Sequence, residues 1–448
     1  MVRKRCLQLS SVAGRKLSGR TRQGVFKMEK CIERPRSLCS LHGALDVIGN
    51  IYRAIPILHA SPGCSMQASS RTNLYYLGGY HGLPSSNAYE KEVVFGGTQR
   101  LRETIKGSLE IMDGDYYAVL TGCSMGINGD DVDSVVKEFE ASPYPIASID
   151  TAGFRGDTYT GYNMALLATV KKLAKKTKTD SHLVNIYGQP PSSDITLRGD
   201  LEEITRLLAR IGVKANTFFI RRDGIEQLKN SGNAALNINL SPWLAKNVDT
   251  YYKETFGIET LRFNGWPVGP KDTANFLRTV AERLDLDSEL VDKVIQEEEL
   301  YVYEYLDSLF GNFERHRFIL VGESAKALGL ARFLVNVHGH IPLAIIFTDS
   351  VPKQYQDSIR EEVLKLECPR KADVYFENDV WEIEQIAQKY DGRATLFMGS
   401  SYEKKLAQKL GSHFAITSNP CLDKEILNRS HIGTHGCISL VEDLYNHF

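Results

Sequence analysis

Three cysteines in the first third of the chain carry the strongest chemical signal. Cys39 precedes an apolar stretch with helical spacing, whereas Cys64 and Cys123 each follow a strand-like apolar run and have a glycine directly before them. An open parallel sheet presents groups to a ligand at the carboxyl ends of its strands, and glycine lets the backbone come close to a bulky group. We therefore interpret the three thiols as ligands of a metal cluster; the alternative is three buried structural cysteines.

Composition limits the remaining function classes. The chain has 448 residues, 42% of them apolar, which is enough for two to four domains with their own cores. A net charge of −1 gives no electrostatic reason to expect nucleic acid or a membrane surface as a partner. Eight cysteines without a secretory signal or a membrane span favour reduced thiols or metal ligation, and we expect a cytoplasmic location.

The first 28 residues differ from the rest of the chain. They contain eight lysines and arginines and no acidic residue. A transit peptide can have this composition. We favour a disordered extension, with Met28 as a candidate natural start.

Strand-like and helix-like patterns alternate along the remainder. They fall into three units, residues 29–180, 181–312 and 313–448, and each repeats a strand–turn–helix order. Right-handed parallel crossovers are the economical way to connect such elements. We predict three doubly wound, Rossmann-like α/β domains with parallel sheets. Gly322 follows a strand but lacks a G-x-G-x-x-G pattern, so dinucleotide binding is not expected there.

The contexts of the three cysteines resemble those of component 1 of nitrogenase. The order is Cys39, His-x-x-x-Gly-Cys at 59–64, Val-Phe-Gly-Gly at 94–97, Thr-x-Cys at 121–123 and Gly-Asp-Asp at 129–131. The separations of 25 and 59 residues between successive cysteines are close to those of the beta-type subunit. The resemblance implies a three-domain fold and an eight-iron, seven-sulfur (8Fe-7S) P-cluster, of which Cys39, Cys64 and Cys123 hold half. A four-iron (4Fe-4S) cluster is the alternative.

Other features favour a beta-type over an alpha-type chain. No cysteine lies between Cys123 and Cys368, so the middle-domain cysteine that binds the active-site cofactor in alpha-type chains is missing. Segments 420–423 and 433–436 resemble the beta-type C-terminal motifs. The resemblance implies an electron-relaying oxidoreductase subunit without catalytic residues of its own. Its expected partners are an alpha-type chain, in an α2β2 heterotetramer, and an ATP-hydrolysing iron protein.

Two residues near the cysteines could act either as iron ligands or in a structural role. Asp157 aligns with a beta-type serine that can ligate the oxidised P-cluster, so it is either a further iron ligand or an exposed loop aspartate. His59 is expected to orient the loop by a hydrogen bond rather than to ligate iron.

Departures from the nitrogenase motifs place the chain among nitrogenase-like reductases. They include Asp157 and the sequence of segment 71–80. The leading substrate hypothesis is small methylthio-alkanes, reduced anaerobically with cleavage of a carbon–sulfur bond. The alternatives are the beta subunit of a dinitrogen-reducing nitrogenase and a scaffold on which the active-site cofactor is assembled.

Overall fold

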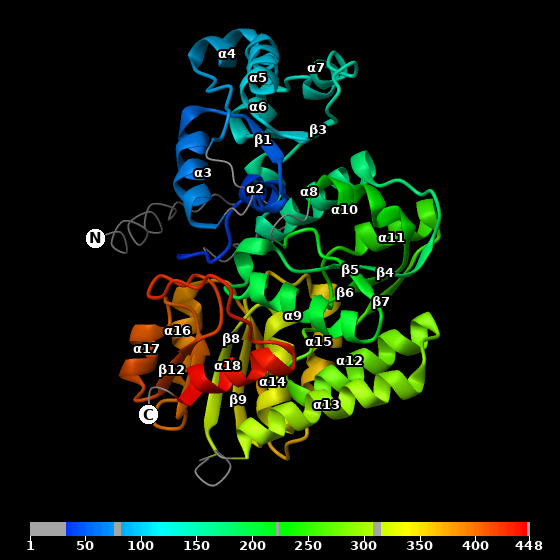
Figure 1. Cartoon of the computed structure of the whole chain (residues 1–448). Coiled ribbons are helices and arrows are strands. Elements are labelled where there is room, and N and C mark those ends of the chain that lie inside the picture. The colour runs from blue at the N-terminus through cyan, green and yellow to red at the C-terminus, as the bar shows by residue number, and fades with distance from the viewer. Residues whose placement is uncertain (1–32, 76–81, 221–223, 308–314, 446–448) are drawn as a thin grey trace, which may run out of the picture. The chain divides into compact units, whose positions relative to one another are not determined.

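Three parallel sheets organise the chain, each covered by helices (Figure 1). The computed structural model describes residues 33–75, 82–220, 224–307 and 315–445. The predicted basic extension, residues 1–28, lies outside these ranges. The mixed α/β architecture with three all-parallel sheets confirms the predicted fold class, and each sheet is built from strands that are consecutive in the chain.

The first sheet has the order β1-β2-β3. Its central strand β2 (Tyr116–Thr121) is buried along its whole length, and so is β1 (Ala54–His59), while β3 (Ile146–Ile149) forms one edge. Strands buried on both faces are continuous apolar runs, as expected for a parallel sheet. The accompanying helices are α2 (Ser40–Asn50), α3 (Pro62–Tyr75), α4 (Glu90–Phe95), α5 (Thr98–Ile111), α6 (Cys123–Asn128), α7 (Val132–Lys137) and α8 (Thr158–Leu173).

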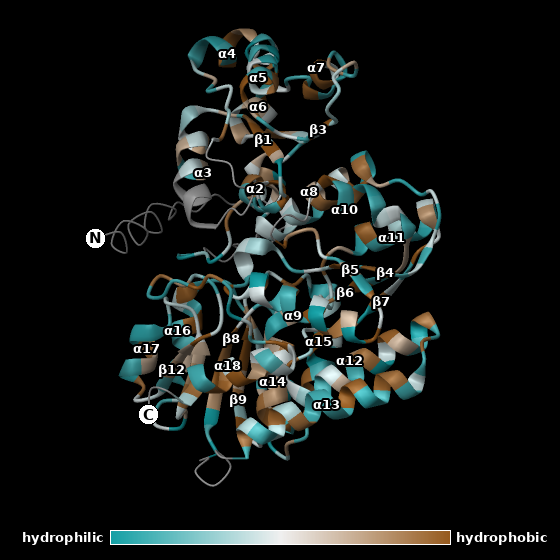
Figure 2. Ribbon diagram, in the orientation of Figure 1, coloured by the Kyte–Doolittle hydropathy of each residue, from teal (hydrophilic) through white to brown (hydrophobic). Residues whose placement is uncertain are grey.

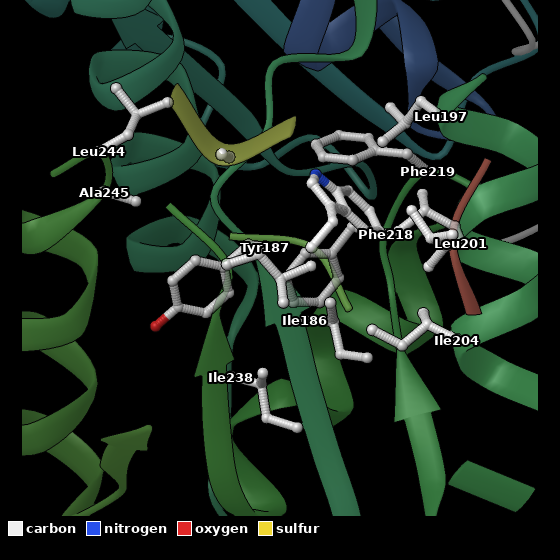
Figure 3. Close-up of a cluster of buried hydrophobic side chains, with 14 of the residues drawn as sticks. Ile186, Tyr187, Leu197, Leu201, Ile204, Phe218, Phe219, Ile238, Leu244 and Ala245 are labelled. Carbon is white, nitrogen blue, oxygen red and sulfur yellow. The ribbon is translucent and has the colours of Figure 1, made fainter. Parts of the chain in front are cut away.

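The middle sheet has the order β5-β4-β6-β7. Its strands are β5 (Lys214–Asn216), β4 (Asp180–Tyr187), β6 (Ala234–Asn239) and β7 (Glu259–Arg262). Figure 3 shows Ile186 of β4 and Ile238 of β6 facing leucines and an isoleucine of α9 (Leu197–Arg210), with Phe218 and Phe219 between them. The other helices of this part are α10 (Ile225–Asn230), α11 (Lys246–Phe256), α12 (Gly269–Leu284) and α13 (Ser288–Leu306).

The last sheet has the order β10-β9-β8-β11-β12. Figure 2 shows its central strands β8 (Arg317–Gly322) and β9 (Ile341–Phe347) as hydrophobic segments, and nearly all their residues are buried. The remaining strands are β10 (Asp373–Phe376), β11 (Leu396–Gly399) and β12 (His413–Ile416). The helices are α14 (Ser324–Asn336), α15 (Lys353–Leu364), α16 (Val380–Gln388), α17 (Lys404–Lys409) and α18 (Gly433–Tyr445).

Two local predictions near the cysteines were wrong. The sequence of residues 117–131 predicts a strand that ends at Cys123 and a glycine-rich turn after it, but β2 ends at Thr121 and Cys123 begins the short helix α6. The many Tyr, Gly and Ser residues between positions 71 and 90 predict a long loop, but α3 starts with Pro62 and runs to Tyr75. Proline suits the first position of a helix because that position needs no backbone donor.

The crossing of α2 and α8 brings two backbones into direct contact. A Cβ atom added to Gly43 would lie 1.9 Å from the carbonyl oxygen of Thr158, and one added to Gly161 would lie 1.9 Å from the carbonyl oxygen of Ser40. Each helix therefore presents a glycine to the backbone of the other. Only glycine permits an approach this close.

Replacement of Gly161 tests this crossing. We expect Gly161→Ala to lower the free energy of unfolding by about 2–3 kcal/mol, because the new methyl group overlaps backbone atoms that cannot rotate away. The control is Gly107→Ala in α5, where an added Cβ meets nothing within 4 Å. It should stabilise the protein by about 0.5–1 kcal/mol through helix propensity. Denaturation midpoints measure both changes, and equal midpoints for the two variants would contradict the close crossing.

Candidate metal centre

Cys39 lies at the start of α2, where two segments of the chain pair. It occupies the N-cap of α2 and forms an isolated antiparallel bridge with Asp157, and the backbone N–H of Ser40 donates to the carbonyl oxygen of Gly156 at 2.9 Å. The Cys39 Sγ lies 3.3 Å from Nδ1 of His42, one turn into the same helix. The thiol is half-buried.

Cys123 meets Cys39 across Gly153. The backbone N–H of Gly153 donates to Cys123 Sγ at 3.1 Å. A Cβ added to Gly153 would lie 2.9 Å from Cys123 Sγ and 3.5 Å from Cys39 Sγ. The buried hydroxyl of Ser40 holds this loop against α2, because it donates to the carbonyl oxygens of Thr151 and Ala152. The two thiols therefore share one small space that a side chain at position 153 would fill.

Cys64 lies in the first turn of α3, after the strand β1. Burial raises the pKa of its thiol, and the nearby thiols of Cys123 and Cys39 raise it further, while hydrogen bonds from Ser61 and the Cys123 backbone lower it. This electrostatic coupling indicates that the three thiols are neighbours. Among the described residues no three histidines, cysteines or acids converge closely enough to hold a single metal ion.

His59 anchors the segment before Cys64, as expected from the sequence. Its Nε2 lies 2.9 Å from Asp130 Oδ2 and its Nδ1 lies 3.0 Å from Ser86 Oγ. Asp130 also accepts from the backbone N–H of Gly97 at 2.9 Å. Burial lowers the pKa of His59 despite the carboxylate beside it, so the neutral ring donates from Nε2 to Asp130. These bonds connect the loops that precede α3, α5 and α7.

The chain was compared with known proteins. A family model described as "Nitrogenase component 1 type Oxidoreductase" matches residues 39–448. This chain belongs to the nitrogenase component 1 family. The match begins at Cys39 and includes all three site cysteines, and it confirms the family that the cysteine contexts predicted.

Individual members of the nitrogenase component 1 family agree with this assignment. The vanadium-iron nitrogenase beta chain of Trichormus variabilis is 24% identical over 412 residues, which cover 86% of each protein. The cofactor biosynthesis protein NifE of Clostridium pasteurianum is 26% identical over 388 residues, which cover 84% of this chain and 80% of NifE. The solved structure of nitrogenase Cp1 at pH 6.5 superposes with a TM-score of 0.80 at 20% identity, covering 96% of this chain and 94% of that one, and shows a shared fold.

The residues around the site fit the iron–sulfur chemistry of the nitrogenase component 1 family. The donors are three half-buried thiols, which suit iron in a cluster, and glycine at position 153 leaves the space beside two of them open. Ligands that are neighbours without meeting at one point suit a group of several metal ions better than one ion. In the described part of the chain, no helix is both long and apolar enough to cross a bilayer.

Sequence inspection missed two residues of the site. Neither Gly153 nor His42 was predicted to be part of the site. The three-residue separation of Cys39 and His42 places both on one face of a helix, and this signal was present in the sequence. Nothing in the sequence placed Gly153 against two distant thiols, because that contact depends on how α2 and α8 cross.

Asp157 has a defined structural role that corrects the expectation of an exposed loop aspartate. It is half-buried at the N-cap of α8, and its Oδ1 accepts from the backbone N–H groups of Tyr159 and Thr160 at 3.2 and 3.1 Å. Among the described residues, the hydrogen bonds of this carboxylate are all made by Oδ1, which leaves Oδ2 outside the cap. The capping role and a ligand role are therefore compatible.

Two substitutions of Asp157 distinguish the effect of its capping hydrogen bonds from the effect of its negative charge. We expect Asp157→Ala to cost about 1 kcal/mol of stability, because two backbone donors lose their acceptor, and Asp157→Asn to cost much less, because its amide oxygen still caps α8. Thermal or chemical unfolding of the metal-free chain measures both. Equal losses for the two variants would show that the charge, and not the acceptor geometry, stabilises the helix start.

Proposed function

We propose that this chain is the beta-type, electron-relaying subunit of a nitrogenase-like reductase. In this proposal Cys39, Cys64 and Cys123 hold half of a P-cluster-like iron–sulfur cluster at the interface with an alpha-type chain. The observation that carries it is the placement of Cys39 and Cys123 together against Gly153, with Cys64 in the first turn of α3.

The surface around the thiols supports a shared cluster. Exposed apolar side chains follow Cys64, Cys123 and Gly153 in the chain, with Met66 77%, Ile127 76% and Phe154 57% exposed, and Phe95 is 82% exposed. Exposed apolar side chains that gather near one site mark an interaction surface. An alpha-type partner that buried them would also supply the remaining ligands and exclude water from the cluster.

The protein groups around the cysteine sulfurs would set the redox potential of the cluster. The potential of an iron–sulfur cluster depends on hydrogen bonds to its sulfurs and on solvent exposure. The Gly153 N–H donates to Cys123 Sγ, and His42 Nδ1 lies within hydrogen-bonding distance of Cys39 Sγ. The Gly153 contact stabilises thiolate charge on Cys123, and the His42 contact does the same for Cys39 when Nδ1 carries the proton.

The rest of the proposed electron path lies in other proteins. Electrons would arrive from an ATP-hydrolysing iron protein and leave for a cofactor in the alpha-type partner of an α2β2 complex, in the cytoplasm. The substrate would be reduced in that partner; small methylthio-alkanes are our leading substrate class, and dinitrogen is the alternative.

A cofactor-assembly scaffold is the second candidate function. The similarity to NifE, over 84% of this chain, supports it. A scaffold would hold a simpler four-iron cluster and would pass its cofactor to another protein. The number of irons bound by the complex separates the two functions.

Anaerobic co-purification with the alpha-type chain tests the proposal. We expect a complex with about eight irons at the interface of each pair of chains and a cluster signal in electron paramagnetic resonance. Cys64→Ala should reduce the iron of this interface to background, because the cluster loses a thiolate. Cys368→Ala, a half-buried thiol packed against the core, is the matched control and should keep the wild-type iron content.

Three results would change the conclusion. Equal iron in the Cys64 and Cys368 variants would remove Cys64 from the ligand set. About four irons per pair of chains, with cofactor released to another protein, would favour the scaffold. A complex without iron would refute both functions.

A redox titration tests Asp157 as a further ligand. We propose that Asp157 binds iron in the oxidised cluster, and Asp157→Asn should then shift the potential of that oxidation step while the reduced cluster keeps its iron. The asparagine still caps α8, so a shift in potential would not come from a change in the start of this helix. Superimposable titrations of wild type and variant would leave Asp157 with its capping role alone.

A further inference from the structure

A small polar chamber is lined by residues on both sides of Cys39 in the chain. It has a volume of about 50 Å³, and its lining includes Ser37, Leu38 and His42, which surround Cys39 in the sequence. The other walls come from the middle and last parts of the chain, at Ser192, Glu323 and Thr348. A polar space of this size holds one or two water molecules.

Within the described parts of the chain, two buried polar side chains of this chamber have no side-chain hydrogen-bond partner. Glu323 is 6% exposed and begins α14, yet its carboxyl does not cap the helix and receives a hydrogen bond only from its own backbone. Thr348 is 1% exposed, and its hydroxyl has no hydrogen-bond partner among the described residues. Buried polar groups normally have a partner, so these two indicate bound water.

The groups around Glu323 favour its neutral form. Burial raises the pKa of its carboxyl to about 8, and the acids Asp349 and Asp194 raise it as well, while Arg36 lowers it. Arg36 is already bound to Glu403, at 2.7 Å, and the phenol of Tyr159 is buried nearby. On the α2 side, His42 and Asp46 line the chamber, and the Asp46 carboxylate accepts from Ser192 Oγ.

A second cavity lies beside the chamber. It has a volume of about 230 Å³ and shares Ser192 and Asn419 with the chamber. Its outer lining includes the exposed residues Lys424 and Glu425. Water in the two cavities would give a proton a route between Glu323 and solvent.

We propose that Glu323 is a proton store that compensates the charge of the electron relay at the cysteine site. Glu323 holds its proton while the cysteine-bound group carries the transferred electron. When that electron passes to the partner chain's redox centre, Glu323 releases one proton through the chamber to solvent and becomes a carboxylate. When the iron protein supplies the next electron, Glu323 takes up one proton. This inference rests on the proposed function.

Proton release from Glu323 accompanies the loss of an electron because charges interact strongly in the low-dielectric surroundings of the chamber. Loss of one electron adds one positive charge near Cys39, and a carboxylate formed in the same buried region offsets it. The interaction is favourable because few other charges remain free to respond: Arg36 is paired with Glu403, and Asp194 is paired with Lys326. Without the proton release, the oxidised site would carry an uncompensated charge.

The test compares Glu323→Gln with Glu425→Gln in the iron-loaded complex. The second variant makes the same chemical change at an exposed position of the outer cavity. The redox potential of the cluster should fall with rising pH on either side of pH 8 in wild type and in E425Q, because oxidation then releases a proton. It should be nearly independent of pH in E323Q. Iron content and the paramagnetic signal of E323Q should equal those of wild type.

An infrared measurement on the metal-free chain examines Glu323 without the cluster. At neutral pH the wild type and E425Q should show the C=O band of a protonated carboxylic acid that E323Q lacks. Absence of this band in wild type would overturn the proposal, and so would an unchanged pH dependence of the potential in iron-loaded E323Q. A wild-type complex without iron would instead overturn the proposed function, with the infrared result still reporting the protonation of Glu323.

Discussion

The close crossing of α2 and α8 is the constraint on which the metal centre depends. Gly43 and Gly161 let the two backbones touch, and the crossing fixes the starts of both helices. Cys39 caps α2 and Asp157 caps α8, so both residues are positioned by the same contact. The loop that carries Gly153 is held between them by the Ser40 hydroxyl. A shift of either helix would separate the thiols from one another.

The site has three features that would each help an electron carrier in a different way. On its outer side, exposed apolar residues offer a surface that a partner chain can cover. On its inner side, a polar chamber with a buried acid is lined by Leu38 and His42, close to Cys39 in the chain. Cys39 and Cys64 also lie in the first turns of helices, where backbone N–H groups favour negative charge. An electron carrier gains from all three, since it must exclude water, keep its thiolates ionised and balance its charge.

Much of the fold could be predicted from the sequence because the buried strands are continuous apolar runs separated by helical patterns. Errors occurred where tertiary contacts outweigh local preference. Residues 123–128 resemble a turn because of their glycine, but they form α6, against which the Ala152 and Phe154 side chains pack at Gly126. Asp157 resembled an exposed loop residue because the sequence does not show which helix it caps.

The sequence by itself determined the family, the three parallel sheets and the identity of the candidate thiol ligands. Those properties follow from residue types and local spacing, which are visible in the linear sequence. The tertiary structure alone decided that Cys39 and Cys123 meet at Gly153, that His42 contacts a thiol, and that Glu323 lines the polar chamber. The contacts at Gly153 and at Glu323 join residues that are far apart in the chain, and the meeting at Gly153 depends on the close crossing of α2 and α8 that glycine permits.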